Sequence, residues 1–314
     1  MRVGPTGCGR LMLLRVVAVL PSLLTMPAIA HAAEPTPVHG TAPTVEPGQL
    51  SQVSNAQAIT SRIWMPALDE GFVPQGLTVV GDRVLVAGYK STSPRLARGE
   101  SHVFAVDTTT GALTGRFRLP PEVGHPGGLA NDRRGTLFVA ERGRLYMINL
   151  ARALTDGDTR AAVLGVADVD RAMGPSFLTW HDGFLWFGPY EKYGEPRLYR
   201  YPVATVFRPG GGVYLTADDK AHSIPIDVRT QGAAFDGEGK LWLSQSGGQG
   251  GVVQRLDPAT GDVLDLFELM AGVEDLSFDS ANRLWSVSEA GSLRWRRWET
   301  YYPLIFSMDV ERLR

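Results

Sequence analysis

The sequence predicts an all-β protein, a five-bladed β-propeller with four-stranded blades, closed into a ring by its N-terminal strand. Three observations predict this fold. One pattern recurs five times along the 314 residues: a small or polar segment, a short apolar strand, a turn with Asp or Gly, and a second apolar strand. The copies start roughly 40 to 55 residues apart, which is the spacing of propeller blades. The 36 glycines and 21 prolines favour short strands and tight turns.

Each copy of the repeat contains two apolar segments that we expect to form neighbouring strands. In chain order they are 74–77 with 84–86, 126–129 with 137–139, 175–178 with 185–187, 230–233 with 241–243, and 273–276 with 284–286. Trp186, Trp242 and Trp285 share one position of the repeat, which predicts packing between blades and not ligand stacking. A third strand follows each pair, and a fourth follows in the first four copies.

The missing fourth strand of the last copy stands at the other end of the repeat region. Residues 58–66 resemble the fourth strand expected at 112–120, and they directly precede the first blade. We therefore expect the N-terminal strand to complete the fifth blade, which leaves no inner sheet edge open. The propeller domain is predicted over 57–314. A six-bladed ring is the alternative, if the insertion at 202–228 forms a further sheet.

Residues 1–32 have the pattern of a signal peptide of the Sec type. Three arginines accompany an apolar run at 16–24, and small residues mark cleavage sites near Ala30 and Ala32. The run is too short to span a bilayer, so we expect a secreted protein, extracellular or periplasmic, without a membrane span. Cleavage removes Cys8, the single cysteine, so the mature chain can form no disulfide.

Residues 33–56 are rich in Pro, Thr, Ser and Gly and repeat with neither a helix nor a strand period. They are expected to be a disordered linker. The net charge of −2 excludes a whole-protein binder of polyanions, and no nucleic-acid partner is expected. The sequence contains no zinc-protease motif, no nucleophile elbow and no dinucleotide fingerprint. We expect a monomer.

Propeller topology points to a candidate site. The first strand of a blade starts on the face where the second strand ends, so two sets of residues meet at one mouth. These positions differ between blades of a repetitive chain, which predicts a ligand site; the alternative is a solvated loop face. The candidate catalytic residues are His125, Glu141 and Glu289. The candidate ligand-binding residues are Gln75, Lys90, Arg142, Tyr190, Lys192, Gln231, Gln245, Glu274 and Asp275.

The residue types at this mouth suggest two kinds of chemistry. Crowded carboxylates raise one another's pKa and can supply a general acid or base. Carboxylate oxygens also bind Ca²⁺, which is a candidate cofactor in the central channel, although no Ca²⁺-binding loop motif is present. We expect a basic rim above an acidic inner ring, and a small polar or anionic ligand or a glycan. Residues 294–302 interleave Arg with Trp and Tyr, so they can stack on a ligand or pack over the blade.

The repeat Pro-x-Gly-Leu followed by Asp-Gly-x-Leu-Trp resembles the secreted propellers of the NHL, YncE and gluconolactonase (lactonohydrolase)-like superfamily. It covers residues 57–314, and its motifs belong to the scaffold. Because that superfamily contains lactonases, lyases and binding proteins, the resemblance implies a lactone-hydrolase or lyase-type enzyme. A non-catalytic extracellular module that binds a glycan or envelope component is the alternative.

A narrower likeness is to the plant-type and bacterial glutaminyl cyclases, which are five-bladed. Their Phe-x-Gln-Gly-Leu motif resembles residues 72–77, with one residue inserted. Their Tyr-Glu-Ser motif resembles Tyr89-Lys90-Ser91, in which Lys90 stands at the position of the family's catalytic glutamate. A glutaminyl-cyclase-like enzyme is therefore a lesser alternative.

Overall fold

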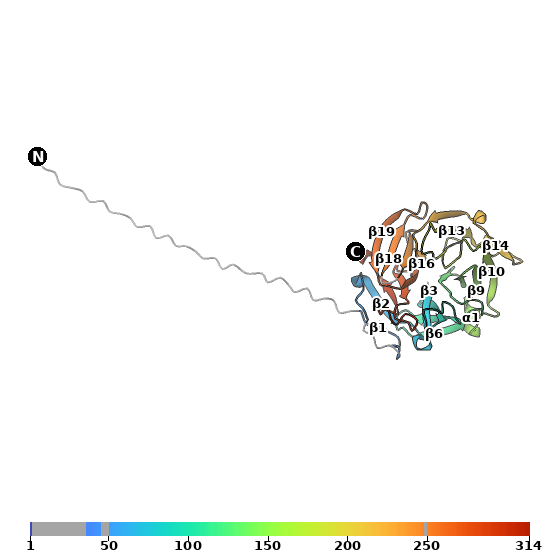
Figure 1. The fold of residues 1–314 in the computed structure, drawn as a ribbon, viewed down its shortest axis with the longest axis horizontal. Coiled ribbons are helices and arrows are strands. Elements are labelled where there is room, and N and C mark those ends of the chain that lie inside the picture. The colour runs from blue at the N-terminus through green and yellow to red at the C-terminus, as the bar shows by residue number, and fades with distance from the viewer. Residues whose placement is uncertain (2–35, 45–49, 248–249) are drawn as a thin grey trace. The chain divides into compact units, whose positions relative to one another are not determined.

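The computed structural model describes Met1 and residues 36–44, 50–247 and 250–314. The expected signal peptide, residues 1–32, lies outside the described residues apart from Met1. Pro35–Arg314 forms one compact unit. Within it, five sheets surround a common axis, which confirms the five-bladed propeller (Figure 1).

The first three blades follow one another in chain order, and their strands are mostly antiparallel. Blade one contains β3 (Phe72–Val80), β4 (Arg83–Lys90), β5 (Ser101–Asp107) and β6 (Leu113–Arg118). Blade two contains β7 (Gly128–Asn131), β8 (Thr136–Glu141), β9 (Arg144–Asn149), β10 (Val163–Val169) and β14 (Val213–Leu215). Blade three contains β11 (Phe177–His181), β12 (Phe184–Gly188), β13 (Arg197–Pro202) and β15 (His222–Pro225).

The last two blades and the short helices complete the unit. Blade four contains β16 (Thr230–Phe235), β17 (Leu241–Ser246), β18 (Gly251–Leu256) and β19 (Val263–Leu269). Blade five contains β20 (Val273–Phe278), β21 (Leu284–Ser288), β22 (Leu304–Met308), β2 (Ile59–Trp64) and β1 (Val38–His39). The helices are α1 (Leu150–Asp156), α2 (Val203–Val206), η1 (Ala56–Ala58), η2 (Leu68–Glu70), η3 (Ala217–Asp219) and η4 (Val310–Arg312). Over the described ranges, no helix is both long and apolar enough for a membrane span.

The N-terminal strand closes the ring as predicted. β2 pairs antiparallel with β22, with Ile63 opposite Ile305 and Arg62 opposite Phe306. Ile63 is fully buried in the core that blades one and five share. Blade five is therefore assembled from both ends of the propeller, and its sheet holds the two ends together without a covalent link.

The long insertion after β13 does not form a sixth blade, so the six-bladed alternative is wrong. Its strand β15 pairs with β13 and supplies the fourth strand of blade three. Its strand β14 pairs in parallel with β10 and extends the outer edge of blade two. Both strands add to existing sheet edges.

The expectation of a disordered linker does not hold for the parts of 33–56 that the structure describes. Val38–His39 pairs in parallel with Arg62–Ile63, at the outer edge of blade five. Arg62 Nε also donates to the carbonyl of Thr36 at 2.6 Å. Backbone pairing at an open strand edge needs no side-chain periodicity, which explains why the sequence pattern did not reveal it.

The first strands pack backbone against backbone around the axis, which explains the glycine of the repeat. A Cβ atom at Gly128 of β7 would lie 2.5 Å from the backbone nitrogen of Leu178 in β11. A Cβ atom at Gly232 of β16 would lie 2.4 Å from the Cα of Asp275 in β20. Such contacts are too short for any side chain, so these strands can approach only where the repeat places glycine.

Asp275 joins these first strands near the axis. Its side chain is fully buried, and Oδ2 accepts hydrogen bonds from the backbone N–H groups of Leu77 at 3.0 Å and Leu129 at 2.8 Å. Oδ1 accepts from the N–H of Leu276 at 3.0 Å, and the backbone of Ala233 is a further partner. One carboxyl group thus links the first strands of blades one, two, four and five.

The repeated tryptophans pack inside and between blades, as the repeat predicted. Trp186, Trp242 and Trp285 are all buried. The indole N–H of Trp242 donates to Asp236 Oδ2 at 2.8 Å, and that of Trp285 donates to Asp279 Oδ2 at 2.9 Å. The turn aspartates of these two blades therefore satisfy the buried indoles.

We predict that Ile63→Ala destabilises the protein by about 3 kcal/mol, because it leaves a cavity in the core beside the closing strand. Leu113→Ala is the matched control: Leu113 lies in the fourth strand of blade one but is 51% exposed, and its loss should cost under about 0.5 kcal/mol. Urea unfolding measures both values. Equal losses in the two variants would show that β2 contributes no core to the ring.

We also predict that Asp275→Asn lowers the free energy of unfolding by about 2–4 kcal/mol. The amide keeps one acceptor oxygen but presents an NH₂ group to backbone donors, which leaves buried N–H groups unpaired. Asp107→Asn is the control, since Asp107 also accepts from backbone N–H groups but in an exposed hairpin turn. Urea unfolding should show a clearly smaller loss there, and a loss as large as that of Asp275→Asn would contradict the linking role.

Candidate functional site

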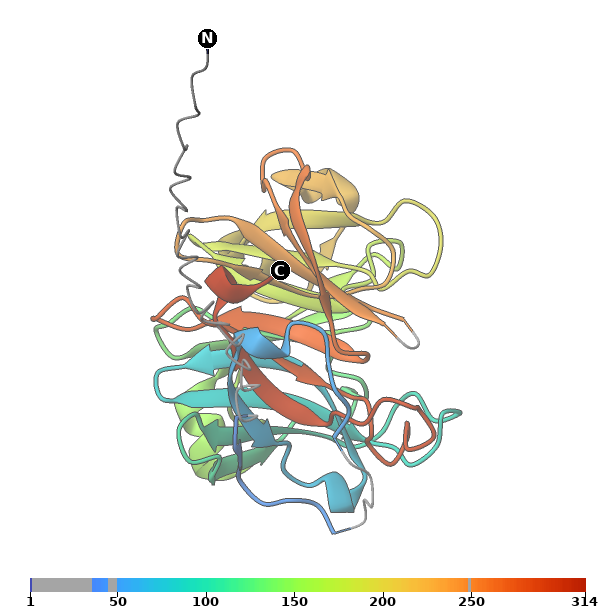
Figure 2. The ribbon, with the colours of Figure 1, turned by 90° about the vertical axis from the view of Figure 1, so that its left-hand side faces the viewer.

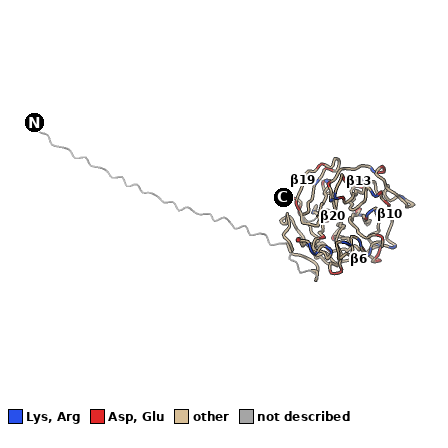
Figure 3. Tube along the Cα trace, in the orientation of Figure 1, with Lys and Arg blue, Asp and Glu red and all other residues tan. Residues whose placement is uncertain are grey.

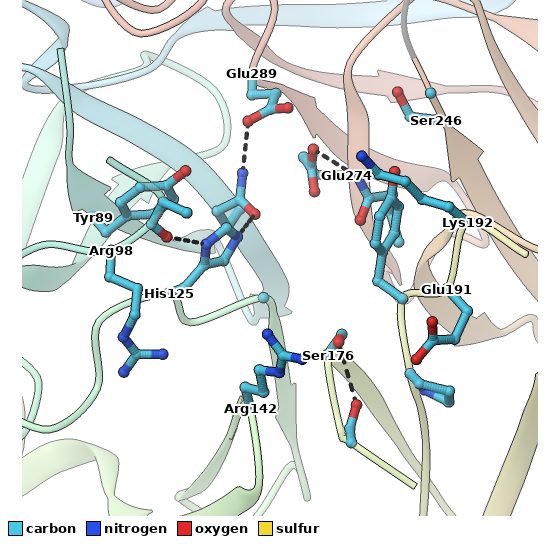
Figure 4. A pocket seen from close by; sticks show the side chains of 18 of the residues that line it. Tyr89, Arg98, His125, Arg142, Ser176, Glu191, Lys192, Ser246, Glu274 and Glu289 are labelled. Atoms are coloured by element: carbon cyan, nitrogen blue, oxygen red, sulfur yellow. Dashed lines mark hydrogen bonds between the residues drawn. The ribbon is translucent and has the colours of Figure 1, made fainter. Parts of the chain in front are cut away.

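A cavity of about 540 Å³ opens on the face where first strands start and second strands end. Loops after the second strands surround it, and Figure 2 shows the loops of residues 91–100 and 289–303 on the same face. Eight of the residues predicted for the site line this cavity: Gln75, His125, Arg142, Tyr190, Lys192, Gln231, Glu274 and Glu289. Figure 4 shows how His125, Arg142, Lys192, Glu274 and Glu289 surround it.

Bulges in the first strands place three of these side chains. The pairing register shifts between Pro74 and Leu77 in β3, between Thr230 and Gly232 in β16, and between Val273 and Leu276 in β20. An extra residue in a strand re-aims the side chains beside it. The bulges lie at Gln75, Gln231 and Glu274, which line the cavity, while Asp275 binds the backbone around the axis.

The predicted catalytic residue Glu141 lies beneath the cavity wall and does not line it. It is buried, and Oε2 accepts from the backbone N–H groups of Gly124 at 2.8 Å and His125 at 2.7 Å. Oε1 forms an ion pair with Arg98. Glu141 therefore holds the backbone that carries His125 and is placed as a positioning residue.

The structure also places Lys90, Gln245 and Asp275 outside the cavity. The Nζ of Lys90 lies 3.9 Å from Glu70 and 5.2 Å from the centre of the Phe72 ring. Gln245 donates to Gln254 at 2.7 Å. Asp275 is occupied by the backbone donors around the axis.

Glu274 and Glu289 form a buried carboxyl pair at the base of the cavity. Gln75 donates to Glu289 Oε2 at 3.0 Å, and Gln231 donates to Glu274 Oε1 at 3.2 Å. The two carboxyl groups also hydrogen-bond to each other. Burial raises the pKa of Glu289 to about 7. Burial, and next the charge of Glu289, raise the pKa of Glu274 well above its usual range. The pair therefore retains a proton near neutral pH.

His125 is connected to this pair through Gln75. The ring of His125 stacks on Tyr89 with centroids 4.4 Å apart. Its Nδ1 lies 2.6 Å from the carbonyl oxygen of Ala97, which can only accept, so Nδ1 carries a hydrogen. Its Nε2 lies 2.7 Å from Gln75 Oε1. Gln75 therefore bridges an imidazole and a carboxyl group.

Two protonation states fit this bridge, and they differ by a flip of the Gln75 amide group, which exchanges its oxygen and nitrogen. With Gln75 donating to Glu289, its oxygen accepts from Nε2 of His125, which then bears protons on both nitrogens. That arrangement is an imidazolium with a carboxylate. Burial favours the neutral form, because it lowers the pKa of His125 and raises the pKa of Glu289. The hydrogen bonds thus favour the charged form of the two residues, whereas burial favours the neutral form. Perturbed pKa values of this kind are common at functional sites.

Cations line the same cavity as the carboxyl pair. Arg142, Arg171 and Lys192 line the cavity, and none of them forms an ion pair within the part of the chain that the structure describes. Residues of both charge signs are scattered around the ring (Figure 3). A third carboxylate, Glu191, also lies at the rim. The unpaired cations are therefore a local feature that favours an anionic ligand.

Fourteen of the 22 residues that line the cavity were not among the site predictions, and five of these carry a cation or an indole: Arg98, Arg171, Arg294, Trp295 and Trp298. Arg171 lies in the loop before β11, and a search of all loops that precede first strands would have found it. In the loop at 294–302, the indoles of Trp295 and Trp298 stack on each other with centroids 4.8 Å apart. They also line the cavity, so the two indoles pack against each other and can still contact a ligand.

The residues present do not fit a Ca²⁺ ion at this mouth. Across the described ranges, no group of three or more His, Cys, Asp or Glu side chains could hold a metal. The carboxyl groups of Glu274 and Glu289 face amide N–H donors of Gln231 and Gln75. A cation would be repelled by these donors, which are placed for anionic oxygens.

Comparisons with known proteins show the fold. No family model and no curated protein matches the sequence. A solved glutaminyl cyclase from Myxococcus xanthus is similar in structure, with a TM-score of 0.55 and 11% identity over 80% of this chain and 94% of that chain. A glucose dehydrogenase has a TM-score of 0.43, with 15% identity over 86% of each chain. A streptogramin B lyase has a TM-score of 0.40, with 13% identity over 80% of this chain and 96% of that chain. At these identities the likeness extends to the propeller fold and no further.

Proposed function

We propose that this protein is an acid–base enzyme that acts on a small anionic substrate in the cavity at the propeller mouth. The reaction is of the lyase or lactone-hydrolase type. The observation that carries this proposal is the proton-sharing pair Glu274 and Glu289 in a cavity that cations also line, among them Arg142, Arg171 and Lys192, which have no ion-pair partners in the described part of the chain. The volume of about 540 Å³ suits a small molecule. Secretion, as the N-terminal pattern predicts, is part of the proposal.

Glu289 is the proposed general base. A pKa of about 7 is close to the optimum for proton transfer at neutral pH. Gln75 orients Glu289, and Gln231 orients Glu274. Arg142 and Lys192 lie in loops of neighbouring blades and can bind the anionic group of a substrate from two sides.

In a lyase reaction, Glu289 takes the proton from the carbon beside the bound carboxylate. The cations stabilise the negative charge that develops on the carboxylate, and the bond to the leaving group breaks. Tyr190 lines the same cavity and can donate a proton to the leaving group, because burial raises its pKa and keeps the phenol protonated. With a lactone, Glu289 takes the proton from a water molecule, which attacks the carbonyl carbon. The ring C–O bond then breaks, and the leaving alkoxide takes a proton from Tyr190.

The other candidate functions differ in what the cavity must supply. A binding module would use the same cations, with Trp295 and Trp298 against a sugar ring, and would release its ligand unchanged. A glutaminyl cyclase would need an acid where Lys90 stands, and this lysine lies outside the cavity beside Glu70. We therefore do not propose cyclase activity.

We predict that Glu289→Gln lowers kcat/KM by 10²-fold or more while the affinity for substrate changes little. In the wild-type protein, kcat/KM should rise with pH and level off above about 7, as the base loses its proton. The assay screens small lactones and β-substituted carboxylates. Glu238→Gln, in an exposed turn of blade four, is the control and should behave as wild type. Binding without turnover in the wild-type protein would support the binding module instead.

We predict that stability falls as pH rises from about 4.5 to 7. The folded protein keeps the Glu289 proton up to about pH 7, whereas the unfolded chain releases it near 4.5. The folded state therefore binds more protons in this window, and it loses about 3 kcal/mol of stability across it. Glu289→Gln should make this slope clearly shallower, although burial also raises the pKa values of Glu274 and Asp275 and they keep their part of it. Glu238→Gln should leave the slope as it is in the wild-type protein. Urea unfolding at pH 5 and 7.5 measures it; an unchanged slope in Glu289→Gln would contradict the raised pKa.

A further inference from the structure

A second cavity, of about 510 Å³, lies between blades three and four. It is lined by the hairpin turn that joins β11 to β12, by the turn at Pro258–Ala259, and by Arg200, His222 and Phe235. These turns join first to second strands and third to fourth strands. They therefore lie on the face of the ring opposite the carboxyl pair, and the cavity is separate from the proposed active site.

Blade four contains the same tryptophan and arginine with a carboxylate beside them. Trp242 of β17 stands opposite Arg255 of β18, and Arg255 stands opposite Asp265 of β19. The guanidinium group lies 5.9 Å from the centre of the Trp242 ring. Arg255 Nε donates to Asp265 Oδ2 at 2.7 Å, so the charge of the arginine is balanced within its own blade.

Blade three has the same tryptophan and arginine but lacks the carboxylate. Trp186 of β12 stands opposite Arg200 of β13, and Arg200 stands opposite His222 of β15. The guanidinium group lies 5.4 Å from the centre of the Trp186 ring and 4.8 Å from that of Phe184. Arg200 Nε and His222 Nε2 are buried and have no hydrogen-bond partner among the residues described.

A second carboxylate of blade four is also replaced by histidine. In blade four, Asp236 follows the last residue of β16 and binds the indole of Trp242. In blade three, the residue that follows Trp180 is His181, whose ring stacks on Phe235 with centroids 4.1 Å apart. Asp182, the carboxylate at the rim, lies 3.5 Å from His181 and is largely exposed. Histidines therefore stand in blade three at two positions where aspartates stand in blade four.

We propose that this cavity binds a small carboxylate that carries an apolar, ring-sized body. The carboxylate pairs with the guanidinium group of Arg200, which lacks the partner that Asp265 gives to Arg255, and it lies beside the ring of His222, which stands at the position of Asp265. An arginine fork fits a carboxylate with two parallel hydrogen bonds, and Arg200 forms no ion pair within the part of the chain that the structure describes. Phe184 and Phe235 supply the apolar wall for the body of the ligand. This site does not depend on the function proposed for the first cavity.

The test titrates the full-length protein with benzoate, with benzamide as its neutral analogue and with acetate as the anion without a ring. Binding is followed by NMR through the ring signals of His181 and His222. We expect benzoate to shift both signals saturably at millimolar concentrations, and benzamide and acetate to bind at least tenfold more weakly. No saturable shift with benzoate, or equal affinity for benzamide, overturns the proposal.

Two variants test whether benzoate binds because Arg200 lacks a carboxylate partner. His222→Asp gives Arg200 a carboxylate partner, as Asp265 is for Arg255. This variant should no longer bind benzoate, which the ring signal of His181 reports. Its melting temperature should equal or exceed that of the wild-type protein. Arg200→Gln should weaken binding at least tenfold. Arg255→Gln, which removes the paired arginine of blade four, is the matched control and should change the affinity less than twofold. Unchanged benzoate affinity in both His222→Asp and Arg200→Gln overturns the proposal.

Discussion

The carboxyl group of Asp275 is the contact on which the arrangement of the ring depends. The first strands approach so closely that only backbone fits between them at Gly128 and Gly232, so their amide groups point at the axis with few partners available. A single buried carboxyl that accepts from Leu77, Leu129 and Leu276 satisfies several of these donors together. Because it binds strands from different blades, it fixes their relative heights, and with them the positions of the side chains at the mouth.

The candidate site follows from the same strand. The bulge in β20 places Glu274 in the cavity beside the strand-linking Asp275, and the following strand β21 leads to Glu289. Both carboxyl groups therefore belong to the blade that the N-terminal strand closes. Burying two such groups together is unfavourable, and the structure offsets the cost by retaining a proton and by the amides of Gln75 and Gln231. A site of this kind needs the rigid support that the closed ring gives.

The sequence predicted the ring well because the five copies of the repeat correspond to the five blades. The strand at 58–66 had no blade of its own, which indicated that it completes the last blade. It placed Gln75, Gln231 and Glu274 in the site because first strands must start at the mouth. It failed at Lys90 and Gln245, since the direction of a side chain at a strand end depends on local pairing. The strand at Val38–His39 forms by backbone pairing, which leaves no periodic pattern in the side chains. The bridge that Gln75 forms between His125 and Glu289 depends on distances between three blades, which a sequence pattern does not contain.

Departures from the repeat are informative because the other blades supply an internal reference. Blade four shows that Trp242, Arg255 and Asp265 can be fully satisfied within one sheet. Blade three keeps the tryptophan and the arginine, but His222 replaces the aspartate and leaves buried donors unpaired. Blade three lacks the carboxylate that would pair with its arginine, and this lowers the stability of the fold. Such a local loss of stability is expected at a site where a ligand supplies the missing carboxylate. The same reasoning applies to the mouth, where the carboxyl pair of blade five has no counterpart in the residues that blades one and four contribute, Gln75 and Gln231.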